Sequence, residues 1–412
     1  MMKEKEEKRV PQLRFPEFTD DWEQRKLGEV ATYRRGSFPQ PYGKSEWYDG
    51  DGAMPFVQVA DVSDEMNLVE NTKQKISILA QPMSVFAEIN SVLVTLQGSI
   101  GRVAITQYGA FVDRTVLIFE KYKAEIDKTF WAYIIKQKFI DEARKAPGGT
   151  IKTITKEALS DFDLSIPNYQ EQKQIGAYFR NLDHLITLHQ RKLEKLKKLK
   201  KGLVQKLFSQ EVRFKADDGS EFPEWEEKKL GELGTFIKGA ALSKADISEY
   251  GSPFILYGEL YTTYKEVAYN IQRRTQAIVD KKYYSCIGDV VIPTSGESAE
   301  EISTATCVMV PNVILGGDLN IFRSDIVDGR IMSYILNHQV KWKIAMIAQG
   351  KSIVHIQAKQ LSNIYVKYPV SKVEQQKIAD CLSLLDDVIE KQKVTLAAWE
   401  EMKKGLLQQM FV

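Results

Sequence analysis

The sequence repeats itself once, and this internal repeat restricts the possible folds more than any other feature. Three separated blocks recur at one offset of 203 residues: WEQRKLGEV at 22–30 and WEEKKLGEL at 225–233, EQKQI at 171–175 and EQQKI at 374–378, and KGL at 201–203 and 404–406. Chance would not preserve one offset across three distant blocks. The repeat therefore predicts a duplicated architecture, in which each half of the chain forms the same kind of unit.

Between these blocks the offset changes. The segment PFV at 55–57 matches PFI at 253–255 at an offset of 198, whereas Pro167 matches Pro369 at an offset of 202. The stretches before the two PF segments share almost nothing. A repeated frame with unlike loops predicts two modules of one kind that recognise two different targets.

Each half begins with short runs rich in β-branched residues, bounded by Gly and Pro. Examples are residues 54–59, 91–96, 253–257 and 289–292. Such runs favour strands. Helices are expected at 130–143 and near 331–348. Together these patterns predict two mixed α+β domains of about 160 residues each.

Each half ends with a long helix that carries a coiled-coil pattern. Apolar residues alternate at steps of four and three, which is the spacing of a coiled-coil seam. The first seam contains Leu182, Ile186, Leu193, Leu196, Leu203 and Leu207, and the second contains Leu385, Ile389, Leu396, Trp399, Leu406 and Met410. The two seams agree even at polar positions, where His189 matches Gln392 and Lys200 matches Lys403.

A long amphipathic helix needs a partner for its apolar stripe, and the other copy is the nearest one. We therefore predict an α+β fold with two duplicated globular domains separated by two long antiparallel coiled-coil helices, related by a pseudo-two-fold axis. The predicted segments are 1–168, 169–209, 210–369 and 370–412. An ordinary hairpin core or a dimer interface is the alternative. The seam from Leu182 to Leu207 is roughly 38 Å long at about 1.5 Å per residue, which is close to one turn of duplex DNA.

Composition excludes several classes of protein. The net charge is only +2, so binding of a polyanion by bulk charge is excluded and any nucleic-acid contact must come from local patches. Three separated cysteines and four histidines argue against a disulfide framework and against a zinc site. The charged N-terminus has no apolar core behind it, and no apolar run reaches ~18 residues, so a cytoplasmic location is expected.

No catalytic motif was found. The GKS segments at 43–45 and 350–352 lack the first Gly of a phosphate-binding loop, and neither HExxH nor GxSxG occurs. The chain is therefore expected to be non-catalytic. Two alternatives stay open: a coiled-coil adaptor that binds proteins, and an enzyme with a metal-dependent nuclease site that has no motif.

Polar side chains near the expected turns are candidates for contacts with DNA. In the first module they are Arg34, Arg35, Lys44, Gln58, Gln97, Ser99, Arg102, Arg114 and Lys152. In the second module they are Lys238, Lys244, Tyr257, Arg273, Arg274, Ser295, Glu297, Lys351 and His355, with Glu259 and Tyr261 in the same set of turns. Such side chains distinguish base edges in the major groove or hold phosphates. For any one of them, an ordinary solvent-exposed side chain is the competing interpretation.

The doubled motifs give the chain a resemblance to a known family. FPEF at 15–18 with Trp22 and LGE at 27–29 recurs as FPEW at 222–225 with LGE at 230–232, and Pro167 with EQ at 171–172 recurs as Pro369 with EQ at 374–375. In this order they resemble the DNA-specificity subunit of type I restriction–modification systems, over nearly the whole chain.

The resemblance implies a function and partners. The globular modules would be target recognition domains, each reading one half of an asymmetric bipartite site in double-stranded DNA, and the helices would set the spacing between the halves. Two methyltransferase (modification) subunits, which carry S-adenosylmethionine, would bind the chain, together with restriction/translocase subunits that use ATP and Mg. No cofactor is expected on this chain itself. A pseudo-two-fold axis would explain two identical partners.

Overall fold

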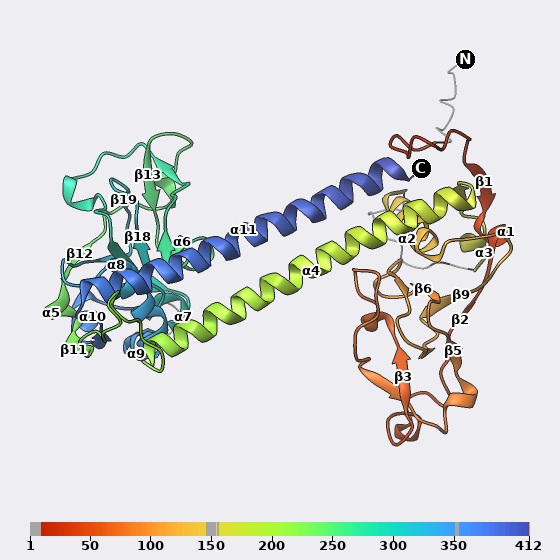
Figure 1. Cartoon of the computed structure of the whole chain (residues 1–412), viewed down its shortest axis with the longest axis horizontal. Helices are drawn as coiled ribbons and strands as arrows, with labels where there is room; N and C mark the ends of the chain where they lie inside the picture. The colour runs from red at the N-terminus through yellow and green to blue at the C-terminus, as the bar shows by residue number, and fades with distance from the viewer. Residues whose placement is uncertain (1–9, 146–153, 155, 351–353, 412) are drawn as a thin grey trace, which may run out of the picture. The chain divides into compact units, whose positions relative to one another are not determined.

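The computed structural model describes residues 10–145, 154, 156–350 and 354–411. It consists of two compact units, Met1–Arg191 with Val394–Val412, and Lys192–Lys393. Two long helices, α4 (Tyr169–Phe208) and α11 (Lys372–Met410), each contribute to both units (Figure 1). Each unit therefore contains one globular domain and a part of each long helix.

The globular domain of the first unit combines two four-stranded sheets with a helix. One sheet has the order β2-β9-β6-β7, and the other has the order β4-β3-β8-β5, in which only the β3–β8 pair is parallel. The strands are β2 (Ala31–Arg35), β3 (Met54–Val57), β4 (Gln74–Ile76), β5 (Val85–Ala87), β6 (Val92–Thr95), β7 (Val103–Ile105), β8 (Ala110–Val112) and β9 (Val116–Tyr122). Helix α2 (Lys128–Lys145) buries Phe130, Trp131 and Tyr133 in the same core as β6 and β9.

The second unit repeats this plan with different strand numbers. A five-stranded sheet has the order β12-β20-β16-β18-β14, and smaller sheets have the orders β15-β13-β19 and β17-β21. The strands are β12 (Thr235–Lys238), β13 (Ser252–Ile255), β14 (Val267–Ala268), β15 (Arg274–Thr275), β16 (Asp289–Pro293), β17 (Ser295–Gly296), β18 (Thr306–Val308), β19 (Ile314–Leu315), β20 (Leu319–Arg323) and β21 (Val354–His355). The helix expected near 331–348 is divided: a π-helical turn, Ile335–Gln339, lies between α8 (Gly329–Tyr334) and α9 (Lys341–Ile347).

Short elements complete both domains. The repeated LGE segments form α1 (Leu27–Val30) and α5 (Leu230–Leu233), each preceded by a strand that pairs with the strand just before a long helix. These pairs are β1 (Glu23–Lys26) with β10 (Asp163–Ile166), and β11 (Glu226–Lys229) with β22 (Tyr365–Tyr368). Among the described residues, the remaining helices are α3 (Lys156–Ser160), α6 (Glu259–Thr262), α7 (Ala299–Ile302), α10 (Ala358–Ser362), and the 3-10 turns Ser45–Trp47, Val59–Asp61, Gln81–Met83, Lys244–Asp246 and Lys281–Tyr283.

The repeated EQ dipeptide fixes the start of α4 to the first domain. Glu171 is fully buried, and it accepts hydrogen bonds from Arg14 Nε at 2.6 Å and Trp22 Nε1 at 3.3 Å. Gln172 donates to the Pro167 carbonyl at 2.9 Å and accepts from the backbone N–H of Asp127 at 3.1 Å. A buried carboxylate is tolerated only when its charge and lone pairs are satisfied, which explains why Trp22 and Glu171 belong to the repeat.

The same arrangement recurs in the second unit. The fully buried Glu374 pairs with Arg213 at 3.1 Å and accepts from Trp225 Nε1 at 3.2 Å. Gln375 donates to the Pro369 carbonyl at 2.7 Å. The sequence repeat is thus a repeat of one anchoring site for a long helix.

Within each unit the two long helices run antiparallel. In the first unit, Asp183 of α4 pairs with Lys403 of α11 at 2.5 Å, and Gln190, later in α4, bonds to the earlier Glu400 at 3.4 Å. All twelve residues of the expected seams are buried or half-buried, whereas off-seam leucines such as Leu188 and Leu199 are exposed. The α+β class, with two duplicated globular domains and two long antiparallel helices, is confirmed.

Candidate nucleic-acid interface

Two candidate arginines of the first domain lie side by side at the end of β2. Arg34 and Arg35 line a hollow of about 190 Å³ together with Tyr33. Arg34 pairs with Glu120 at 2.7 Å, and both side chains are exposed. Arg35 donates to the Ile154 carbonyl at 3.3 Å. Both guanidinium groups are held at the surface of the domain and present positive charge there.

The turn after β6 brings two further candidates together. The fully buried Thr95 donates from its hydroxyl to the Ser99 carbonyl at 2.5 Å and accepts from the Arg102 backbone N–H at 3.0 Å. The Arg102 guanidinium pairs with Asp64 at 3.0 Å, and Gln97 is exposed at the tip of the turn. This turn therefore presents one cation and several exposed polar groups.

The other candidates of the first domain are separately placed. The Arg114 guanidinium lies 4.7 Å from the centre of the Phe38 ring. Lys44 pairs with the exposed Glu46 at 3.0 Å. Gln58 precedes a 3-10 turn, and its backbone N–H donates to Asp61 at 2.9 Å. Lys152, like Lys351 of the second domain, lies outside the described residues.

In the second domain, three candidates line one pocket. Lys244, Tyr257 and Arg273 surround a space of about 610 Å³, which Glu259 and Tyr261 also line. The rings of Tyr257 and Tyr261 have centres 6.5 Å apart. Two cations, the buried carboxylate of Glu259, the exposed carboxylate of Asp318 and two aromatic rings line this pocket, and these donors and acceptors suit a base edge.

A second pair of candidates meets across two short strands. Ser295 of β17 is the register partner of His355 of β21, and its hydroxyl lies 3.0 Å from His355 Nδ1. The exposed Glu297 lies two residues after Ser295, and its backbone N–H donates to the Glu301 carboxylate at 3.1 Å. Arg274 donates to the Gly251 carbonyl at 3.5 Å, and Lys238 is exposed at the end of β12.

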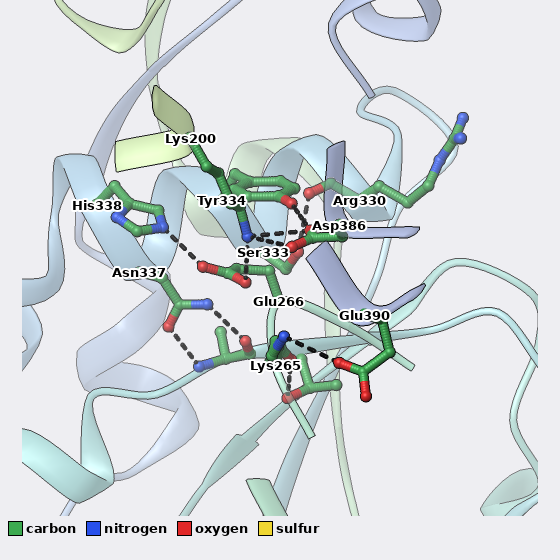
Figure 2. A network of polar contacts seen from close by, with 12 residues as sticks. Lys200, Lys265, Glu266, Arg330, Ser333, Tyr334, Asn337, His338, Asp386 and Glu390 are labelled. Atoms are coloured by element: carbon green, nitrogen blue, oxygen red, sulfur yellow. Dashed lines mark hydrogen bonds and ion pairs between the residues drawn. The ribbon is translucent and has the colours of Figure 1, made fainter. Parts of the chain in front are cut away.

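A polar network between the second domain and the helices was not expected from the sequence (Figure 2). Lys200 of α4 lies 2.7 Å from Asp386 of α11 and 3.1 Å from Glu266. Tyr334 donates to Asp386 at 2.5 Å, and His338 lies 2.9 Å from Glu266. Figure 2 shows the Lys200, Glu266 and His338 side chains pointing toward one another.

The network shifts the pKa values of its members. Burial would raise the pKa of Glu266, but the hydrogen bond with His338 and the charge of Lys200 outweigh it and lower this pKa to about 2. Burial and the neighbouring Asp386 carboxylate raise the pKa of the Tyr334 hydroxyl. Both groups therefore keep one charge state at neutral pH, which favours a structural role. The sequence contained one signal for the contact between the helices. The seam lysines Lys200 and Lys403 are 203 residues apart, and so are their partners Asp386 and Asp183 on the opposite helices.

Among the described residues, no group of three or more His, Cys, Asp or Glu side chains is arranged to hold a metal ion. No helix in the described part of the chain is long and apolar enough to cross a membrane.

Comparison with known proteins identifies relatives along the whole chain. The family model described as "Type I restriction modification DNA specificity domain" matches residues 19–198 and again 223–397. The type I restriction enzyme MjaVIII specificity subunit of Methanocaldococcus jannaschii is 25% identical, over 98% of this chain and 95% of its own length. The MjaIX specificity subunit of the same organism is 21% identical, over 90% of this chain and 89% of its own.

Solved structures share the fold. The S subunit of a type I restriction–modification system from M. genitalium superposes with a TM-score of 0.61 at 17% identity, covering 98% of this chain and 99% of that one. A chain from a study of complex assembly and conformational transition of the type I R-M system gives a TM-score of 0.55 at 15% identity, covering 95% and 97%. The two family matches correspond to the two halves of the sequence repeat.

Proposed function

The chain belongs to the type I restriction–modification DNA specificity family, and from this premise we propose that it is the sequence-specificity subunit of such a complex. Each globular domain reads one half of an asymmetric bipartite DNA site. The long helices set the length of the unread gap between the halves. The chain recruits the subunits that act on the DNA.

One observation carries this proposal: the family match is doubled, and the two domains differ at the positions that would touch DNA. The first domain offers the Arg34 and Arg35 pair, and the second offers the pocket of Lys244, Tyr257 and Arg273. Two copies of one frame with unlike polar groups suit two unlike half-sites, because base edges are distinguished by their donors and acceptors.

The chain itself is proposed to be non-catalytic. Adenine methylation would be performed by two bound modification subunits that carry S-adenosylmethionine, and translocation and cleavage by restriction subunits that use ATP and Mg. The doubled family match favours this stoichiometry, because two copies of one frame offer equivalent surfaces to equivalent partners.

The test is a genome-wide map of methylated adenines in cells that carry this chain with its modification subunits. We expect one motif with two short defined blocks and an unread gap. A footprint of the purified complex should protect the same two blocks. A continuous or sequence-blind footprint would contradict the proposal.

Two further measurements test the alternative functions. If the chain is an adaptor for proteins, its affinity will lack the steep fall with salt that phosphate contacts produce. If it conceals a nuclease site, the lone purified chain will cut DNA in the presence of magnesium.

A further inference from the structure

The pocket of the second domain contains an ion pair between Glu259 and Arg273, and the arginine of this pair is better explained by recognition than by folding. Glu259 is 7% exposed, and its Oε2 accepts the backbone N–H of Leu256 at 3.0 Å, which closes the turn before α6. Its Oε1 lies 2.9 Å from Arg273 Nε. The carboxylate therefore joins a backbone turn to one arginine side chain.

The first domain shows that the turn does not need the arginine. Asp61 occupies the corresponding place after β3 and is 3% exposed. It accepts the backbone N–H of Gln58 at 2.9 Å and the backbone N–H of Lys73 at 3.0 Å. Backbone donors thus satisfy this acid in the first domain, whereas in the second domain a cationic side chain replaces one of them.

The ion pair leaves the outer part of the arginine uncommitted. Arg273 is about one-third exposed on its side chain and lines the pocket beside Tyr257 and Tyr261. Within the described residues its terminal guanidinium nitrogens have no hydrogen-bond partner, and its buried Nε has the ion pair but no aligned hydrogen bond. The other candidate arginines with a carboxylate partner, Arg34 and Arg102, pair with acids that are far more exposed.

A guanidinium whose Nε faces a buried carboxylate presents its two terminal nitrogens as a fork. This fork matches O6 and N7 of guanine in the major groove, and a lysine cannot reproduce it. The ion pair at Nε restricts the side chain before binding, which reduces the entropy lost on binding. We propose that Arg273, positioned by Glu259, reads a guanine in the half-site of the second domain. This inference rests on the proposed function.

The experiment measures discrimination at each base of the site. The complex of the full chain with its modification subunits is tested against duplexes that carry all four bases at every position of both blocks. The wild-type complex should prefer guanine at one position of the second domain's block. Arg273→Ala and Arg273→Lys should both reduce that preference on the order of 10- to 100-fold, with all other positions unchanged.

Lysine keeps the charge, so Arg273→Lys separates base reading from phosphate contact. If Arg273 contacts a phosphate or merely neutralises Glu259, Arg273→Lys will retain the guanine preference, and the inference is overturned. As a positioning residue, Glu259 should act at the same base: Glu259→Gln should weaken the preference there alone, and Glu259→Asp should restore part of it.

Lys282→Ala is the matched control, since Lys282 is an exposed cation of the same domain, 3.7 Å from the exposed Asp280, and does not line the pocket. It should leave every preference unchanged. A bipartite motif that Arg273→Ala and Arg273→Lys both leave intact would overturn this inference and leave the proposed function standing. The absence of any bipartite motif in the wild-type complex would instead overturn the proposed function, and this inference with it.

Discussion

Lys200 Nζ lies 2.7 Å from Asp386 Oδ1, and the same relationship recurs between Lys403 and Asp183 at 2.5 Å in the other unit. Each lysine occupies a seam position of one long helix and meets an aspartate of the other helix. Lys200 lies over the Tyr334 ring at 5.1 Å and Lys403 over the Tyr133 ring at 5.2 Å, each in the adjoining domain. Polar groups in an apolar seam specify the register of a helix pair, so each globular domain is attached where that register is fixed.

The two lysines should differ in their contribution to stability. Lys200 faces two carboxylates, Asp386 and Glu266, and is 14% exposed, whereas Lys403 pairs with Asp183 and is 17% exposed. Removing one partner of a buried pair leaves an uncompensated charge. We expect Lys200→Met to lower the free energy of unfolding of its unit by about 2–4 kcal/mol, and Lys403→Met by roughly half as much.

Urea unfolding followed by hydrogen exchange of each unit separately measures both effects. Lys201→Met, at an exposed neighbouring position of α4, is the control. Equal losses for Lys200→Met and Lys403→Met would show that Glu266 adds nothing to the pair.

The stability of the second unit should depend on acid pH through Glu266. The pKa of Glu266 is lowered from 4.5 to about 2, so the folded state binds fewer protons than the unfolded state between these values. The stabilisation is complete above pH 4.5 and is lost as the pH falls toward 2. The contribution of ionised Glu266 to the free energy of unfolding is roughly 3 kcal/mol above pH 4.5.

Glu266→Gln should therefore flatten the pH dependence of unfolding between pH 2 and 4.5, and should destabilise the unit most at neutral pH. Urea denaturation at pH 3, 4.5 and 7 tests this. The exposed Glu227→Gln serves as the control. An unchanged slope in Glu266→Gln would mean that the acid response arises elsewhere.

The duplicated frame could be predicted from the sequence because its determinants are local and repeat at a fixed offset. The seam positions and the EQ dipeptides recur 203 residues apart, so the two long helices were expected, whereas the anchoring role of Glu171 and Glu374 was not. The pairing of Glu266 with Lys200 could not be predicted, because it joins a divergent loop to a helix over 66 residues. The π-helical turn at Ile335–Gln339 was not predicted for a different reason. Its residues fit a continuous helix equally well.

The candidate site was predicted by residue type but not by grouping. The sequence indicated Ser295 and His355 separately, and only the β17–β21 pairing brings them within 3.0 Å. Likewise, Lys244 and Arg273 line one pocket only because the segments that carry them approach each other in the folded domain. Loop conformation depends on tertiary contacts, which the local sequence does not specify.

Charge reversal in the first domain should affect one half-site only. Arg34 and Arg35 line one hollow at the end of β2, far along the chain from the candidates of the second domain. Arg34→Glu combined with Arg35→Glu should weaken DNA binding on the order of tenfold or more and blur the base preferences of one block. The map of methylated adenines should keep the other block readable. Loss of base preference in both blocks together would contradict independent reading by the two domains.

Shortening both helices should change the gap between the blocks. The segments 190–196 of α4 and 392–398 of α11 lie between the two lysine–aspartate pairs, so their removal keeps Asp183, Lys200, Asp386 and Lys403. Seven residues preserve the phase of the seam and shorten each helix by about 10 Å. This length corresponds to about three base pairs, so the methylated motif should retain both blocks with a shorter gap, or binding should be lost if the duplex cannot present them.

A deletion in only one helix is the control for this design. It leaves partners of unequal length and should destabilise the helix pair without producing a new motif. If the double deletion methylates the original motif with the original gap, the helices do not measure the spacing, and the gap must then be set by the partner subunits.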